Sequence, residues 1–262
     1  MATIPGGAFN DFVFGTSGAD FITAEDGNDY AFGASGDDVI DGGAGEDTLN
    51  GGSGDDVIDG GTGDDLVIGG SGNDDLAGND GADTLLGGSG DDMASGGAGD
   101  DMLVGGAGDD QLSGDAGDDI LLGGTGDDML IGGEGDDQLK GEAGDDVLVG
   151  GEGDDELVGG AGDDVLDGGL GDDVLFGGAG NDLFVFSGGG DVIMDFSEGD
   201  ILQISQSLDG VSLETAGDVA DFAIDLGEAG TLIDFGQGDS VMLSGVSYDD
   251  IAADPSKFIT LV

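Results

Sequence analysis

Aspartate recurs every nine residues along most of this 262-residue chain. From residue 6 to residue 194 the sequence divides without insertion into 21 units of nine, and position six of every unit is Asp. Carboxylates stacked in a column repel one another strongly when water is excluded, so the column requires a counter-charge. Calcium takes six to eight oxygens from carboxylates and backbone carbonyls, whereas magnesium keeps its waters. The spacing therefore predicts calcium between successive turns of the chain.

The predicted ligand carboxylates all stand at position six of their units. They are Asp20, Asp29, Asp38, Asp47, Asp56, Asp65, Asp74, Asp83, Asp92, Asp101, Asp110, Asp119, Asp128, Asp137, Asp146, Asp155, Asp164, Asp173 and Asp182. A solvated acidic surface is the alternative, but solvation does not require Asp at one fixed position. Position five is mostly Asp as well, and we expect its side chain to point into solvent or to support the ligands rather than bind the ion directly.

Glycine and apolar residues define the elements that must hold these carboxylates. Glycine recurs at positions one, two and four, where we expect positive φ in a tight turn. Positions seven to nine favour a three-residue strand whose position-eight side chain points inward. That residue is apolar in all 21 units. Two successive units make one coil, which predicts an all-β fold with two parallel sheets face to face.

The charge balance and the missing residue types exclude several functions. The chain has 61 acidic residues against two basic ones, a net charge of −59 that disfavours nucleic acid and anionic membranes as partners. Without His or Cys it has no imidazole base, no thiol nucleophile and no His-ligated zinc. No apolar run is long enough for a transmembrane segment. The first residues also lack the basic and apolar regions of a cleavable secretion signal.

The unit Gly-Gly-x-Gly-x-Asp-apolar-apolar-x, as at residues 159–167, resembles the repeat of the RTX (repeats-in-toxin) family over about three quarters of the chain. The resemblance implies a right-handed parallel β-roll, a β-helix solenoid with two of these units per coil, and a small C-terminal β-rich capping domain. The domains we expect are an N-terminal arm at 1–5, the calcium-binding β-roll at 6–194, and the cap at 195–262. The cap would carry an uncleaved type I secretion signal.

The resemblance also implies which backbone carbonyls bind calcium. One loop supplies the carbonyls of positions two and four, and the loop two units further along supplies those of positions one and three. One ion would thus bind Gly97, Gly99 and Asp101 with Gly114, Ala116 and Asp119, and the next Asp115, Gly117 and Asp119 with Gly132, Glu134 and Asp137. The neighbouring loops add Gly106, Gly108, Gly123, Gly124, Thr125, Gly126, Gly133, Gly135, Gly141 and Ala143. We expect ~15–18 ions in all, with fewer near the ends of the repeat.

The segment after Met194 is predicted to form short strands at 200–204, 221–226, 230–235 and 240–243. Residues 230–243 look like a hairpin that turns at 236–239. The one predicted helix begins at the cap residue Ser247 and ends near Asp254, before Pro255.

These features together predict a secreted, extracellular or cell-surface calcium-binding structural protein that folds on extracellular Ca²⁺. The first coil is unusually rich in Phe, so we expect copies to self-assemble into a filament, layer or matrix. The expected partners are Ca²⁺, further copies of the chain and a type I secretion apparatus. The alternative is a monomeric secreted adhesin or accessory protein.

An enzyme and an ice-binding solenoid are the remote alternatives. Paired carboxylates can cleave glycosides, but an identical Asp in every unit indicates a structural ligand rather than one catalytic centre. An ice-binding solenoid would present a column of Thr at position three, and here only Thr62 and Thr125 stand there. The sequence therefore favours a structural protein without catalytic activity.

Overall fold

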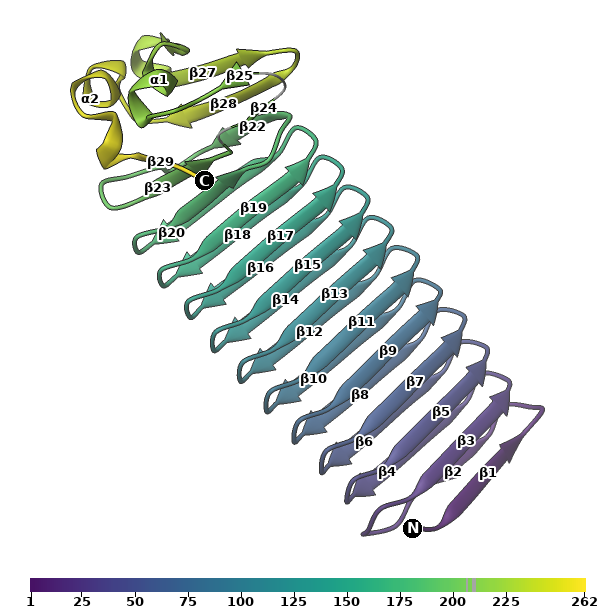
Figure 1. Cartoon of the computed structure of the whole chain (residues 1–262). Helices are drawn as coiled ribbons and strands as arrows, with labels where there is room; N and C mark the ends of the chain where they lie inside the picture. Colours follow the sequence, from purple (N-terminus) through teal and green to yellow (C-terminus); the bar gives the residue numbers. More distant parts are fainter. Residues whose placement is uncertain (206, 209–210) are drawn as a thin grey trace. The chain divides into compact units, whose positions relative to one another are not determined.

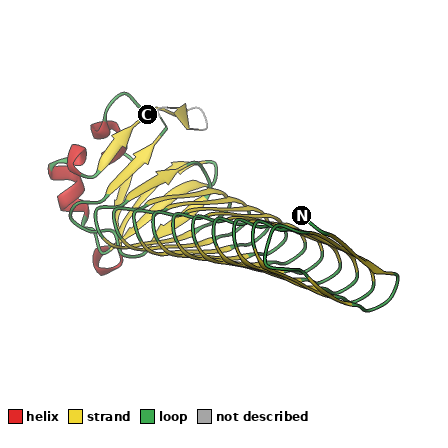
Figure 2. Ribbon diagram, turned by 90° about the horizontal axis from the view of Figure 1, so that it is seen from below, coloured by secondary structure: helices red, strands yellow, loops and turns green. Residues whose placement is uncertain are grey.

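The computed structural model describes residues 1–205, 207–208 and 211–262. The chain forms two compact units, Met1–Glu134 and Gly135–Val262, and each is described by itself. Both units consist mainly of coils of parallel strands, and the second also contains two short helices (Figures 1 and 2). Among the residues described, no helix has the length and apolarity needed to cross a membrane.

In the first unit, odd- and even-numbered strands form two separate parallel sheets (Figure 1). The odd strands are β1 Thr3–Gly7, β3 Phe21–Asp26, β5 Val39–Ala44, β7 Val57–Thr62, β9 Asp75–Asp80, β11 Met93–Ala98, β13 Gln111–Ala116 and β15 Met129–Glu134. The even strands are β2 Phe12–Phe14, β4 Tyr30–Ser35, β6 Thr48–Ser53, β8 Leu66–Ser71, β10 Thr84–Ser89, β12 Met102–Ala107 and β14 Ile120–Thr125.

The pairing register confirms that two units of the repeat make one coil. Val39 of β5 lies opposite Val57 of β7, and each later residue keeps the same offset. The arm at the N-terminus follows this register too, because Thr3 of β1 pairs with Phe21 of β3. The fold is the parallel β-solenoid that the repeat predicts, and its right-handedness stays a prediction.

The strands are longer than the sequence predicts. A typical strand has six residues rather than three and runs from position seven through position three of the next unit, as in Val39–Ala44. Side chains alternate along it, so position one points inward like position eight. The expectation of positive φ at position one was therefore wrong: Gly43 and Gly45, at positions two and four, have φ of 101° and 136°, whereas position-one glycines keep ordinary extended backbone.

Position eight forms the core of both units, as predicted. Leu49, Leu85 and Leu121 of the first unit and Leu148 and Leu166 of the second are fully buried. The stacked rungs bring these side chains into continuous apolar columns between the two sheets. Their burial is the main favourable term that holds the coils together.

The second unit continues the same two kinds of strand. One sheet contains β17 Val147–Glu152, β19 Val165–Leu170, β21 Leu183–Phe186, β23 Ile201–Ile204 and β29 Ile259–Leu261. The other contains β16 Gln138–Ala143, β18 Glu156–Ala161, β20 Val174–Ala179, β22 Gly190–Ile193, β28 Asp239–Ser244, β27 Gly230–Gly236 and β26 Ala223–Asp225. The strands β24 Ser207–Leu208 and β25 Val211–Ser212 pair antiparallel in a small separate sheet.

The C-terminal part of the second unit follows most of the predicted elements. β27 and β28 form the predicted antiparallel hairpin, turning between Gly236 and Asp239. Helix α2, Tyr248–Ala253, begins after Ser247, whose hydroxyl accepts the N–H of Asp250. Helix α1, Ala216–Ala220, was not predicted from the sequence. Two single-turn 3₁₀ segments, Gly227–Ala229 and Pro255–Lys257, also lie in this part. Both helices lie in this part of the chain (Figure 2).

Candidate metal centre

The position-six aspartates are buried, which excludes a solvated acidic surface. All the carboxylates predicted as ligands, from Asp20 to Asp182, are between 0 and 4% exposed. Each one immediately precedes a strand, so the turn before it and the core residue two positions after it fix its backbone. A fully buried carboxylate is costly unless it is paired or protonated.

Each of these side chains reaches toward the preceding coil. The Oδ1 of Asp65 accepts the backbone N–H of Asp47 at 2.7 Å, and the Oδ1 of Asp119 accepts that of Asp101 at 2.7 Å. The second unit repeats the bond between Asp155 and the N–H of Asp137, at 2.8 Å. This ladder satisfies one oxygen of the carboxylate and one backbone donor per unit.

The other carboxylate oxygen has no hydrogen-bond partner at most positions. The buried Oδ2 atoms concerned belong to Asp29, Asp38, Asp47, Asp56, Asp65, Asp74, Asp83, Asp92, Asp101, Asp110, Asp155, Asp164 and Asp173. Proteins rarely leave a buried polar atom unsatisfied, and a repeated exception indicates an ion that binds there.

Burial makes several of these carboxylates reluctant to ionise when no cation is bound. It raises the pKa of Asp56, Asp65 and Asp101 to about 7. The negative charges one coil away raise it further, and the hydrogen bond from the previous coil only partly offsets both effects. Groups with this character bind a divalent cation in exchange for a proton.

Glycine at position one makes room for the carboxylate. A Cβ built on Gly60 would lie 2.6 Å from the Oδ2 of Asp65 and 3.0 Å from the carbonyl oxygen of Gly78, and both contacts are too short for a real side chain. Gly105 has the same relation to Asp110. Position one is therefore glycine because of the space beside the carboxylate, not because of its backbone angles.

Carbonyl oxygens point into the same gap between coils. A Cβ at Gly117 would overlap the carbonyl oxygen of Gly99 one coil earlier, so the position-four carbonyl points forward. A Cβ at Gly96 would lie 2.8 Å from the carbonyl oxygen of Gly114 one coil later, so the position-one carbonyl points back. The carbonyl of Ala116 also points back, because it accepts the N–H of Gly99 at 2.8 Å.

These directions agree with the predicted ligand set of the first site, in which Asp119 stands one coil after Asp101. The remaining predicted carbonyl ligands lie on equivalent strand ends and turns: Gly97, Gly106, Gly108, Asp115, Gly117, Gly123, Gly124, Thr125, Gly126, Gly132, Gly133 and Glu134 in the first unit, and Gly135, Gly141 and Ala143 in the second. Within the described residues no cluster of three or more acidic side chains forms a metal site. The predicted sites combine carbonyl oxygens with the position-six carboxylates, and the individual assignments stay predictions.

Two features of the site were not predicted. Position-five side chains are exposed, as expected, but they also accept hydrogen bonds: the Oδ1 of Asp91 accepts the N–H of Asp109 at 3.1 Å. In addition, Asp200 takes the place of a position-six Asp beyond the repeat, since its Oδ1 accepts the N–H of Asp182 at 3.0 Å. The signal for Asp200 was its separation from Asp182, which equals one full coil.

Asp20 and Asp200 differ from most of the other buried carboxylates. The Oδ2 of Asp20 accepts the N–H of Thr16 at 2.6 Å, and the Oδ2 of Asp200 accepts that of Ser197 at 2.6 Å. Most interior carboxylates lack such a local donor at this oxygen. Local backbone donors thus satisfy, at Asp20 and Asp200, the oxygen that lacks a partner at most other positions.

Comparison with known proteins identifies the repeat. A family model described as the RTX calcium-binding nonapeptide repeat matches in overlapping segments at 5–40, 32–67, 59–94, 68–103, 95–130, 122–157, 131–166 and 158–193. The chain belongs to the RTX calcium-binding repeat family. The RTX repeats bind calcium, and the unsatisfied Oδ2 atoms, the space beside them and the convergent carbonyls fit that ion.

Solved structures also resemble this RTX chain. It is similar to the extracellular lipase LipA from Serratia marcescens, with 25% identity over 86% of this chain and 45% of the lipase, and a TM-score of 0.41. It is similar to a Ca²⁺-dependent β-helical antifreeze protein from an Antarctic bacterium, with 22% identity, 78% of each chain covered and a TM-score of 0.41. The chain spans less than half of the lipase, and with such low TM-scores neither likeness indicates a function. No curated protein matches the chain.

Proposed function

We propose that this RTX protein is an extracellular structural protein that folds when it binds Ca²⁺ outside the cell and then self-assembles. The observation that carries the proposal is the column of buried position-six carboxylates, each with one oxygen left without a partner at most positions. Without cations, a chain with net charge −59 repels itself, and its buried carboxylates oppose folding. Calcium removes both obstacles.

Export before folding follows from calcium affinity. Extracellular calcium sites bind at about 10⁻⁴–10⁻³ M, far above cytosolic calcium. The chain would therefore stay unfolded inside the cell and fold outside, as suits passage through a type I secretion apparatus. RTX repeat proteins are typically secreted, and the proposed secretion signal lies in the C-terminal segment 195–262.

Folding by calcium is tested by circular dichroism. We expect a largely disordered spectrum after exhaustive removal of divalent ions and a β-rich spectrum in millimolar Ca²⁺, with a much weaker response to Mg²⁺. A β-rich spectrum at neutral pH in excess chelator would contradict the proposal.

Self-assembly is supported by aromatic rings exposed on β2 and in the turn that precedes it. Phe9, Phe12 and Phe14 are 82%, 77% and 58% exposed, whereas Val13 between the latter two is buried in the core. They line a hollow of about 350 Å³ beside β1 and β2. Apolar surface of this kind marks interaction sites in soluble proteins. We propose that another copy of the chain covers it.

Light scattering at millimolar Ca²⁺ tests assembly separately from folding. We expect polymers from the native chain, and monomers with an unchanged spectrum from Phe12→Ser. Phe21→Ser, at a less exposed position of the same region, is the matched control and should still polymerise. A persistent monomer of the native chain at high concentration favours the monomeric adhesin or accessory protein instead.

A further inference from the structure

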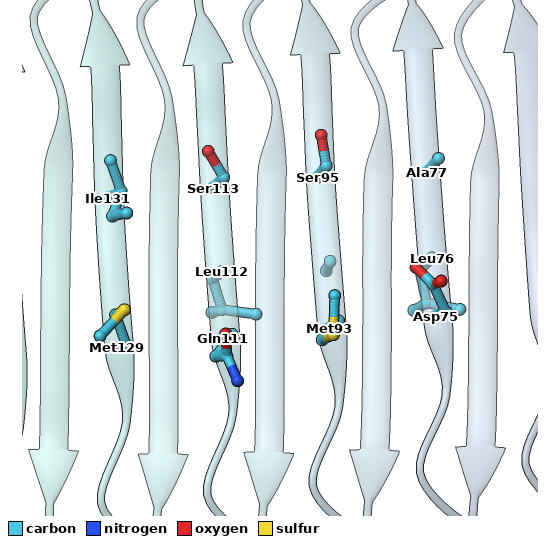
Figure 3. Close-up of a pocket in the computed structure, with 11 residues that line it drawn as sticks. Asp75, Leu76, Ala77, Met93, Ser95, Gln111, Leu112, Ser113, Met129 and Ile131 are labelled. Atoms are coloured by element: carbon cyan, nitrogen blue, oxygen red, sulfur yellow. The ribbon is translucent and has the colours of Figure 1, made fainter.

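The odd-numbered sheet of the first unit carries a trough on its outer face (Figure 3). Small side chains at position nine of three neighbouring strands, Ala77, Ser95 and Ser113, form its floor, and Ile131 closes one end. The trough has a volume of about 250 Å³. It lies on the face of the sheet, away from the turns that hold the position-six carboxylates.

One wall of the trough is a row of position-seven side chains in the order Asp75, Met93, Gln111 and Met129. Met93 and Met129, two coils apart at position seven, are 51% and 44% exposed and stand beside the floor (Figure 3). Ala94 lies beneath them at position eight and is 6% exposed, more than the neighbouring Leu112 at 2%. The smallest core side chain of this region therefore opens the floor where the two thioethers border it. Thioether side chains adapt to apolar and aromatic ligands.

The opposite wall is acidic. The carboxylate of Asp115 accepts hydrogen bonds from the Ser95 hydroxyl at 2.5 Å and from the Ser113 hydroxyl at 2.9 Å. Asp115 holds a positive φ of 76°, a conformation that costs a non-glycine residue free energy. Asp75 adds a second exposed carboxylate on the side of the methionines, where it neighbours Met93. Each side of the trough thus carries one carboxylate.

We propose that this trough binds an extended segment of a partner protein in which a large apolar side chain is flanked by lysine or arginine. The apolar side chain would fill the space over Ala94 and Ser95, against Met93 and the stem of Gln111. The flanking cations would pair with Asp75 and Asp115, which no basic side chain of the described chain contacts. The volume of about 250 Å³ suits one or two large side chains and lies just below the ~300–1,000 Å³ of typical small-molecule sites.

A second copy of the chain is a poor occupant. The chain has only two basic residues, Lys140 and Lys257. Lys257 already pairs with Glu198 at 2.9 Å, and its apolar neighbour Phe258 is buried. Charge complementarity therefore favours a different, basic partner, and this interaction is independent of the proposed self-assembly.

The methionine methyl groups provide a direct test in the calcium-loaded full-length protein. The probe is the peptide Gly-Lys-Phe-Lys-Gly, compared with Gly-Lys-Ala-Lys-Gly and Gly-Glu-Phe-Glu-Gly. With all six methionines carrying ¹³C-methyl labels, we expect the first peptide to shift the resonances of Met93 and Met129. Met102, exposed on the other sheet, should not move. The alanine and glutamate peptides should bind at least about tenfold more weakly.

A variant that fills the trough provides the second arm. Ser95→Phe should abolish the peptide-induced shifts, whereas Asn50→Phe, at the outward position nine of β6 in the other sheet, should leave them intact. The calcium dependence of the circular dichroism spectrum checks that both variants fold. If Ser95→Phe does not fold, the peptide-induced methyl shifts of the native protein decide the question. Equal binding of the lysine–alanine peptide, no methyl shift, or an unchanged response in a folded Ser95→Phe protein would overturn the proposal.

Discussion

Replacing Gly60 by alanine tests whether position one is glycine to leave room for the buried carboxylate. The added Cβ would lie 2.6 Å from the Oδ2 of Asp65, whereas ordinary contacts begin near 3.4 Å. The carbonyl oxygen of Gly78, 3.0 Å from the same point, blocks retreat on the other side. The carboxylate must therefore shift by roughly 0.8 Å if the backbone stays in place.

The cost follows from the contacts that the shift disturbs. The Oδ1 of Asp65 holds a 2.7 Å hydrogen bond with the N–H of Asp47, and a hydrogen bond to a charged group contributes about 1.5–3 kcal/mol. Overpacking a close-packed site costs about 1–3 kcal/mol more. We expect Gly60→Ala to lower the free energy of unfolding by about 2–5 kcal/mol and to raise the calcium concentration at the folding midpoint.

Urea unfolding at saturating calcium, together with calcium titration by circular dichroism, measures both effects. Gly18→Ala is the matched control, because a Cβ there meets no atom within 4 Å and Gly18 has no positive φ. The control should change stability by less than about 0.5 kcal/mol. Equal stabilities and equal calcium midpoints for the two variants would refute the reasoning about position one.

Two further predictions concern the buried carboxylates and the core. The pKa values of Asp56 and Asp101 are about 7 in the ion-free fold and ~3.9 in the unfolded chain. Between pH ~3.9 and about 7 the folded chain therefore binds more protons than the unfolded chain. Its free energy of unfolding therefore falls as pH rises from about 4 to about 7, and circular dichroism of the ion-free protein should show more β structure at pH 5 than at pH 8; the reverse order would contradict the prediction. Leu103→Ala should cost about 2–5 kcal/mol in urea unfolding, whereas Met102→Ala, at an exposed neighbour, should cost little, and equal losses would mean that position eight is not the core.

The strict period explains why most of the fold was predictable. Position eight is apolar in every unit. Because two units make one coil, each position-eight side chain stacks on the position-eight side chain one coil away. Strand length was mispredicted because glycine usually interrupts strands. Here the position-one glycine continues the strand, since its lack of a Cβ admits the carboxylate of Asp65 beside Gly60.

The candidate site was predictable to a different extent at each position. The spacing alone indicated that position-six Asp residues bind a cation, but it did not reveal that Oδ1 is used by the backbone and Oδ2 is left over. That division depends on side-chain direction between coils. Asp200 was missed because Glu198 and Gly199 precede it in place of the usual Gly-Asp order, so the turn no longer matches the repeat although the strand register does.

The trough on the odd-numbered sheet could not be predicted from the repeat, because it depends on small side chains meeting across three coils. Ala77, Ser95 and Ser113 are ordinary variants of the least restricted position of the unit. Only the stacking places them side by side, between Met93 and Asp115.

Counting bound calcium by native mass spectrometry tests the central claim most directly. The account predicts ~15–18 ions on the folded chain, all removed by a chelator together with the β-rich spectrum. Asp101→Asn should lower the count by one or two ions, because each interior carboxylate lies between two consecutive sites, while Asp91→Asn at the exposed position five should leave it unchanged. A folded chain that carries only a few ions, or an Asp101→Asn variant with the native count, would contradict the account.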